Sequence, residues 1–242
     1  MRLNKQTTIL VHLFISYLIF ILPLIFVGSG LGRFSSYALT LFSSSLAIIY
    51  LSLMFRSLFD INITISAMTG FGLKLLIGYM FWEFYMWPDY FNQYTNIAFD
   101  HSEYLYTNTS IIKIAEHRIE NGFFSLPPVV YVLGQGKYIF LNYVISNLYM
   151  SGNSNLLDFS IQNSLFSFYT AFVIALISIS FGTTKRQTKI IFIISLFQPF
   201  SFISTMIWRD VVGQFFAILG VYFLLRSFNS SVLRAPFLIL LS

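Results

Sequence analysis

The sequence predicts an all-α fold, a polytopic helical bundle embedded in a membrane. Hydrophobic residues make up 57% of the 242 positions and charged residues only 10%, whereas soluble globular chains carry about 25% charged residues. The mean hydropathy is +0.75. Apolar stretches long enough to cross a bilayer recur along the chain without the period-2 alternation of a β-barrel, so helices are expected to satisfy the backbone hydrogen bonds in lipid.

Charge and cysteine content exclude several classes of function. The formal net charge is +5, from 14 basic and 9 acidic residues, but the basic residues are scattered between apolar segments. Because they form no basic stripe, no nucleic-acid partner is expected. The chain has no cysteine, and its three histidines (His12, His101 and His117) lack a metal-ligand spacing. We therefore expect no metal centre and no other cofactor.

Six complete spans are expected in one transmembrane domain covering residues 1–242. They are Ile9–Val27, Tyr37–Phe55, Ile61–Phe81, Gln162–Phe181, Ile190–Ile207 and Val211–Leu225. The weaker segment Val129–Ser146 contains two glycines and a lysine, and is expected to be re-entrant or interfacial. A partial seventh span begins at Ala235 and stops after about a third of the roughly 20 residues needed to cross. The chain is expected to be truncated at its C-terminus.

The distribution of basic residues predicts the orientation of these spans. If Val129–Ser146 does not cross, the cytoplasmic side holds eight basic residues, the outer side holds five, and Lys74 lies within a span. The eight are Arg2, Lys5, Arg56, Lys185, Arg186, Lys189, Arg226 and Arg234; the five are Arg33, Lys113, Arg118, Lys137 and Arg209. A crossing segment would move the cluster at 185–189 outside. The N-terminus is therefore expected in the cytoplasm.

This orientation creates a long external loop at 82–161. Seven of the nine acidic residues lie there: Glu83, Asp89, Asp100, Glu103, Glu116, Glu120 and Asp158. Within the loop, Ile111–Glu120 has the spacing of a short amphipathic helix. Ile111, Ile112, Ala115 and Ile119 lie on its apolar side, and Lys113, Glu116, His117 and Glu120 on its polar side. Asn121-Gly122 is expected to end the helix.

An acidic residue among aromatic rings is the first candidate for chemistry. Asp89 follows Trp87 and precedes Tyr90 and Tyr94, just outside the third span. Such rings stack on sugar faces, and the carboxylate could accept a hydroxyl proton. The alternative is an interfacial aromatic belt, which membrane proteins commonly have. A belt does not require Asp89.

Arg209 and Asp210 are the second candidate, because they are the only charged residues between Ile190 and Leu225. Arg209 could face the interior and hold a phosphate through its planar fork of donors. Pro199 in the preceding span could kink that helix and open a cavity. The alternative is a solvated salt bridge in the turn of an outward hairpin.

Three other basic residues are candidates for contact with an anionic head group. Lys74 lies inside the third span, and it is expected either to snorkel to the outer interface or to face the bundle. Lys113 and Arg118 lie on the external helix, where a solvated helix face also explains them.

Two short patterns resemble the polysaccharide polymerases of bacterial membranes, the Wzy-type O-antigen polymerases and the EpsG-like exopolysaccharide proteins. Asp89-Tyr90-x-x-x-Tyr94 is similar to an Asp-Tyr-x-x-Tyr signature of the EpsG-like group, with the second tyrosine one position later here. The run from Ser204 through Arg209-Asp210 to Gln214 is similar to that group's late serine-rich helix end. The resemblance covers roughly 82–226 and implies a GT-C-like glycosyltransferase fold.

The resemblance also implies an activity, a partner and a location. Oligosaccharide repeat units linked to undecaprenyl diphosphate would be joined on the outer face of the bacterial cytoplasmic membrane, giving O-antigen or exopolysaccharide. Arg209 would neutralise the departing diphosphate, and Asp89 would act as base. Trp87, Tyr90 and Tyr94 would stack on sugar rings. Further substrate contacts would come from Asp210, Lys113, Arg118 and Lys74. Membrane lipids and other polysaccharide-export proteins are further expected partners.

Two other functions remain open from the sequence. The first is a transporter or flippase for a lipid-linked glycan, which needs a polar path through the bundle, and Lys74 is the only charged candidate within the spans. The second is an inactive, truncated membrane protein, which the DNA beyond Ser242 would reveal.

Overall fold

The computed structural model of the chain describes residues 5–27, 33–55, 61–84, 109–122, 125, 146–148, 150, 156–197 and 210–228. Every regular element in these ranges is a helix, as the sequence predicts. The helices are α1 (Lys5–Val27), α2 (Arg33–Met54), α3 (Ile61–Phe84), α6 (Thr109–Asn121), α9 (Leu156–Ser180), α10 (Lys185–Phe197) and α12 (Asp210–Phe228). A short helical turn lies at 146–148.

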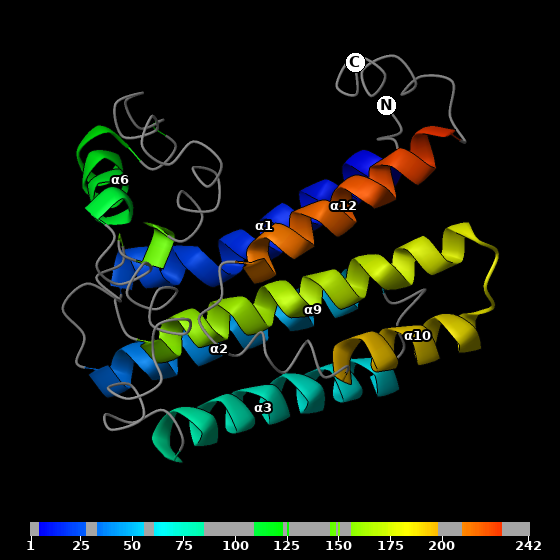
Figure 1. Cartoon of the computed structure of the whole chain (residues 1–242), viewed down its shortest axis with the longest axis horizontal. Coiled ribbons are helices and arrows are strands. Elements are labelled where there is room, and N and C mark those ends of the chain that lie inside the picture. Colours follow the sequence, from blue (N-terminus) through cyan, green and yellow to red (C-terminus); the bar gives the residue numbers. More distant parts are fainter. Residues whose placement is uncertain are drawn as a thin grey trace, which may run out of the picture.

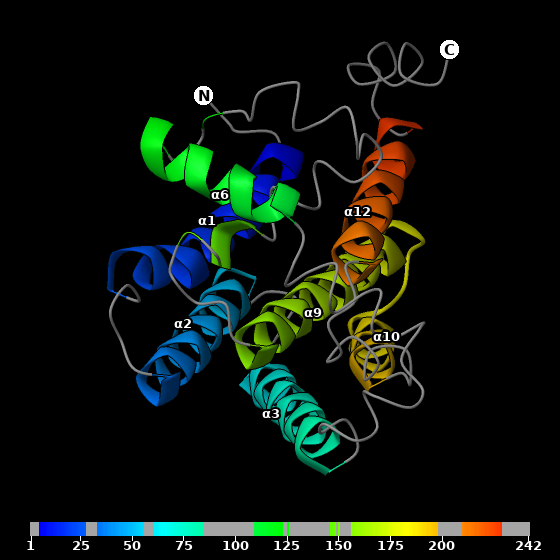
Figure 2. The same ribbon diagram turned by 60° about the vertical axis from the view of Figure 1, so that its left-hand side comes forward.

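Helix α9 occupies the centre of the bundle. It packs against α2, α3, α10 and α12, while α1 packs mainly against α2. Figures 1 and 2 show α9 surrounded by the other long helices in both views. Helix α6 lies at one end of the bundle, and the turn between α9 and α10 lies at the opposite end (Figure 1).

The predicted spans coincide with helices, with boundary differences at several ends. Helices α1, α2, α3 and α12 match the first, second, third and sixth predicted segments to within a few residues at each end. Helix α9 begins six residues before the predicted Gln162 and therefore includes Asp158. Helix α10 covers the predicted span Ile190–Ile207 as far as Phe197. The rest of that span lies outside the described residues. Residues 129–145 and the segment from Ala235 also lie outside them.

The tight connection between α9 and α10 follows from local hydrogen bonding. Gly182 has φ of +78°, and the N–H groups of Gly182 and Thr183 bond the carbonyls of Ile179 and Ser178 at 3.0 and 3.4 Å. This is the Schellman arrangement that ends many helices. Thr184 and Gln187 then form a reciprocal capping box that begins α10, with bonds of 2.9 and 3.3 Å.

The bundle is apolar outside and contains many hydroxyl groups inside. Large apolar side chains point outward along its length, including Phe14, Phe42 and Ile194, which are 51%, 62% and 63% exposed. Buried positions hold Ser16, Thr40, Ser43, Ser44, Ser164, Ser167 and Thr170. The hydroxyl of Ser16 donates to the carbonyl of Ala47 at 2.9 Å and lies 2.9 Å from the Tyr169 hydroxyl. Polar contacts thus join α1, α2 and α9.

Two helices in the described part of the chain are long and apolar enough to cross a membrane. These are the segments Thr8–Val27 in α1 and Ile161–Ser180 in α9. The apolar parts of α2 and α12, Ala38–Met54 and Val211–Arg226, are shorter. Length and composition therefore support a membrane helical bundle, and they do so for fewer helices than the six predicted spans.

Candidate functional site

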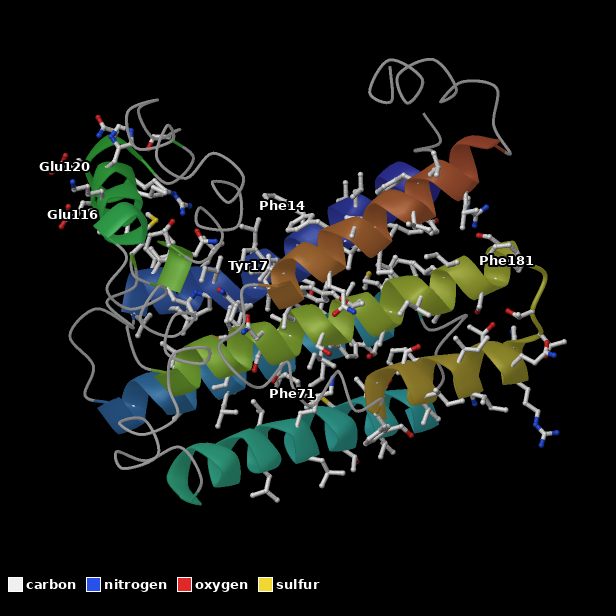
Figure 3. The ribbon with its side chains drawn as sticks, in the orientation of Figure 1. Phe14, Tyr17, Phe71, Glu116, Glu120 and Phe181 are labelled. Carbon is white, nitrogen blue, oxygen red and sulfur yellow. The ribbon has the colours of Figure 1, made fainter. Side chains whose placement is uncertain are left out.

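Helix α6 forms where the external helix is predicted. It runs from Thr109 to Asn121 and ends at Gly122, whose φ is +106° and whose N–H bonds the Arg118 carbonyl at 2.9 Å. The predicted helix end is therefore confirmed. The buried face differs from the prediction, because Ile114, Ala115 and Arg118 are buried whereas Ile119 is 60% exposed. Glu116 and Glu120 point away from the bundle (Figure 3).

Arg118 lies inside the structure rather than on a solvated face. Its side chain is 1% exposed, and Nη1 donates a hydrogen bond of 2.6 Å to the Ser146 hydroxyl. The interpretation of Arg118 as part of a solvated helix face is therefore wrong. That interpretation holds for Lys113, which is exposed. Burying a guanidinium costs free energy unless hydrogen bonds and opposite charges compensate it. The buried position of Arg118 therefore requires such compensation.

Tyr17 connects the Arg118 region with the central helix. Asn147 Nδ2 donates to the Tyr17 hydroxyl at 2.7 Å, and that hydroxyl donates to Gln162 Oε1 at 3.4 Å. The Tyr17 ring packs against Phe166, with centroids 5.5 Å apart. Asn147 directly follows Ser146, the hydrogen-bond partner of Arg118. We name Tyr17, Arg118, Ser146, Asn147 and Gln162 the Arg118 cluster.

Two polar atoms of the Arg118 cluster retain unused hydrogen-bonding capacity. Asn147 Oδ1 and Gln162 Nε2 are buried and have no hydrogen-bond partner among the described residues. One is an acceptor and the other a donor, and buried polar atoms in proteins are nearly always paired. A ligand with hydroxyl groups could use both atoms. The guanidinium nearby would favour a ligand that also carries negative charge.

Lys74 faces the interior of the bundle. Its side chain is 0% exposed, and Nζ donates a hydrogen bond of 2.7 Å to the Ser167 hydroxyl on α9. The snorkelling alternative is therefore wrong, and the inward-facing alternative is the one found. Whether Lys74 contacts a substrate stays a prediction. The hydrogen bond described for Lys74, to Ser167, involves no residue of the Arg118 cluster.

The remaining predicted site residues are not described in atomic detail. Asp89, Arg209, Trp87, Tyr90 and Tyr94 lie outside the described residues. Asp210 is the first residue of α12, but its side chain also falls outside the described part. The roles expected of Asp89 and Arg209 therefore remain predictions.

Sequence reasoning missed most of the Arg118 cluster. Tyr17 lies in an apolar helix and resembles any membrane tyrosine, and Ser146 and Asn147 follow the weak segment without a motif. Gln162 gave a usable signal, because Gln162, Asn163 and Ser164 are three consecutive polar residues at the start of a predicted span. Polar residues in a span usually face the bundle interior.

Comparison with protein-family models, with curated proteins and with solved structures finds no match.

Proposed function

We propose that this chain polymerises oligosaccharide repeat units linked to undecaprenyl diphosphate, at the outer face of the bacterial cytoplasmic membrane. The observation that carries the proposal is the Arg118 cluster, a buried cation beside an amide acceptor and an amide donor that have no partner among the described residues. A lipid-linked oligosaccharide offers diphosphate charge and sugar hydroxyls together. Both chemistries match this cluster.

The apolar exterior supports a membrane location. Side chains such as Phe42 and Ile194 would contact lipid, while the hydroxyl of Ser16 is hydrogen-bonded inside. The basic residues Lys185 and Arg186 are exposed at the end opposite α6. With the positive-inside rule, that end faces the cytoplasm and α6 faces the outside. The Arg118 cluster would then lie on the outer side, where repeat units are joined.

Arg118 acts in this proposal beside the residues that the family resemblance implies. Asp89 accepts the acceptor hydroxyl's proton, and Arg209 stabilises the negative charge on the departing diphosphate. Trp87, Tyr90 and Tyr94 stack on sugar rings. The Arg118 cluster adds a rigid binding surface, because its residues come from α1, α6, α9 and the turn at 146–148.

The test is the length of glycan made in cells that depend on this gene. Arg118→Gln, Asp89→Ala and Arg209→Ala should each shorten the ladder of glycan chains on a gel toward single repeat units. Lys185→Gln is the matched control, because Lys185 is an exposed basic residue at the end of the bundle opposite α6. The amount of protein in the membrane is measured for each variant. An unchanged ladder in Arg118→Gln would remove the role given to the cluster, and an unchanged ladder in all three would refute the polymerase.

A lipid-linked glycan flippase is the second candidate, and one observation favours it. Gln162, Asn163, Ser164 and Ser167 place buried polar groups along α9, and Lys74 adds a buried basic group. A transporter needs such a polar path. Labelled intermediates distinguish the two functions. Loss of a polymerase leaves repeat units on the outer face without polymer, whereas loss of a flippase leaves them inside.

A further inference from the structure

The contact between Lys74 and Ser167 lies deep inside the bundle. Lys74 is near the middle of α3, and Ser167 is near the middle of α9. Their side chains are 0% and 7% exposed. The hydrogen bond of 2.7 Å from Lys74 Nζ to Ser167 Oγ therefore connects two long helices far from either end. Phe71, one turn before Lys74 on α3, is also buried (Figure 3).

Charge compensation for Lys74 is missing in the part of the chain that the structure describes. Its hydrogen-bond partner there, Ser167, is a neutral hydroxyl. The acidic side chains that the structure describes, Glu116 and Glu120, are exposed on α6 at one end of the bundle. A buried ammonium without an anion costs several kcal/mol. An anionic ligand beside Nζ would offset that cost.

The face of α9 that meets Lys74 carries further polar groups. Asn163 and Ser164 lie one turn before Ser167, and spacings of three and four residues place side chains on one helix face. Ser164 is 0% exposed, and its hydroxyl has no hydrogen-bond partner among the described residues. Hydroxyl groups at two successive turns can donate to separate oxygens of one oxyanion.

We propose that Lys74, Ser164 and Ser167 form an oxyanion site in the interior of the bundle that binds a phosphate group. Lys74 supplies the positive charge, and the two serine hydroxyls donate to phosphate oxygens. The site shares no residue with the Arg118 cluster and does not depend on the polymerase. Its ligand is inorganic phosphate or the phosphate of an anionic lipid.

Access to the site requires movement of α3. Lys74 is fully covered, and the neighbouring turn of α3 packs tightly, since a Cβ added at Gly70 would lie 2.7 Å from Leu196 Cδ2 on α10. Phosphate therefore enters only as α3 separates from α9 or α10. Slow binding is expected, because motions of packed helices are slower than side-chain motions.

Equilibrium dialysis of the whole purified chain in neutral detergent, with radiolabelled inorganic phosphate, tests the proposal. We expect Lys74→Met to remove one phosphate site per chain and Ser164→Ala to weaken that site about tenfold. Lys74→Arg should keep it, because the charge remains. The Arg118 cluster could bind a second phosphate, so Arg118→Gln is measured in parallel and should leave the Lys74 site intact. Lys185→Met is the exposed control.

The outcomes separate this site from a buried structural lysine. The proposal is overturned if the unaltered chain binds no phosphate, or if Lys74→Met and Ser164→Ala bind it as the unaltered chain does. Circular dichroism and a single elution peak verify that each variant folds, and Ser164→Ala tests the site if Lys74→Met does not fold. Competition by phosphatidylglycerol added to the detergent as mixed micelles assigns the site to a lipid phosphate, and its absence assigns it to free phosphate. A chain that binds phosphate here but makes no polymer would retain this site and lose the proposed function.

Discussion

The two ends of the bundle use polar side chains in opposite ways. At the turn between α9 and α10, the hydroxyls and amides of Thr183, Thr184, Gln187 and Thr188 bond one another or the helix ends. In the Arg118 cluster, polar groups come from distant parts of the chain, and two buried atoms have no partner among the described residues. The first arrangement is complete by itself, whereas the second has capacity for a ligand.

This difference separates groups that stabilise the fold from groups that are available for binding. A capping network pairs each group locally and is expected to contribute only to stability. A buried polar group without a partner lowers stability, so its presence favours a functional explanation. Changes at the turn should therefore alter stability alone, and changes in the cluster should alter both stability and glycan synthesis.

Tyr17→Phe should have the largest effect on stability. Removing the hydroxyl leaves Asn147 Nδ2 and Gln162 Oε1 without their present hydrogen-bond partner. The loss of stability should be about 1–3 kcal/mol for each buried group. Glycan synthesis should fall as well. Thermal unfolding in detergent and the glycan ladder measure the two effects. Tyr50→Phe is the control, because the hydrogen bond described for the Tyr50 hydroxyl is to the half-buried His12, and its loss should cost less. Equal losses in both variants would contradict a special role for the cluster.

Gly182→Ala should lower stability by about 1–2 kcal/mol, because an L-residue is strained at a φ of +78°. Among the described residues other than its chain neighbours, no atom lies within 4 Å of a Cβ added at Gly182, so the cost comes from the backbone. Glycan length should not change. Gly220→Ala, in helix α12 and equally free of close atoms, should be neutral or slightly stabilising. A shortened glycan ladder in Gly182→Ala at normal protein level would break the contrast between the two ends.

Thr184→Ala removes half of the capping box and should cost about 1 kcal/mol. The unfolding midpoint should fall, with glycan length unchanged. Thr69→Ala, exposed on α3, is the matched substitution without a capping role. If both variants unfold at the same temperature as the unaltered chain, the capping box does not stabilise the turn.

Asn121→Ala should have the smallest effect. Its side-chain amide donates a hydrogen bond of 2.9 Å to the His117 carbonyl at the exposed end of α6. Water replaces an exposed hydrogen bond, so a change within about 0.5 kcal/mol is expected. The unfolding midpoint measures it, and a larger shift would mean that the end of α6 supports the Arg118 cluster.

Helix positions could be predicted from the sequence, but the facing of single side chains could not. Long apolar runs identified α1, α2, α3 and α12, and Asn121-Gly122 identified the end of α6. The buried face of α6 was predicted incorrectly, because apolar periodicity places Ile119 inside and the structure places Arg118 there. Periodicity assumes that charged groups avoid the interior. A hydrogen-bonding partner such as Ser146, distant in sequence, overrides that assumption.

The candidate site was predicted only in part, since its residues come from four separate segments. Lys74 and Arg118 were identified as charges in unusual positions. The residues that complete their polar surroundings are Ser167, Ser146 and Tyr17, which are common residue types and form no motif. Their roles depend on contacts between segments far apart in the chain, which no local pattern contains.

The central position of α9 has a consequence for how the protein is made. Helices α1, α2 and α3 leave the ribosome before α9, yet Ser16 and Lys74 find hydrogen-bond partners on Tyr169 and Ser167 of that later helix. Until residues 156–180 have been synthesised, the early helices must hold these polar groups without their final contacts. The nascent bundle is therefore incomplete for much of translation, when exposed surfaces favour misassembly. Synthesis rate and the insertion machinery should influence the yield of this protein more than substitutions on its outer surface.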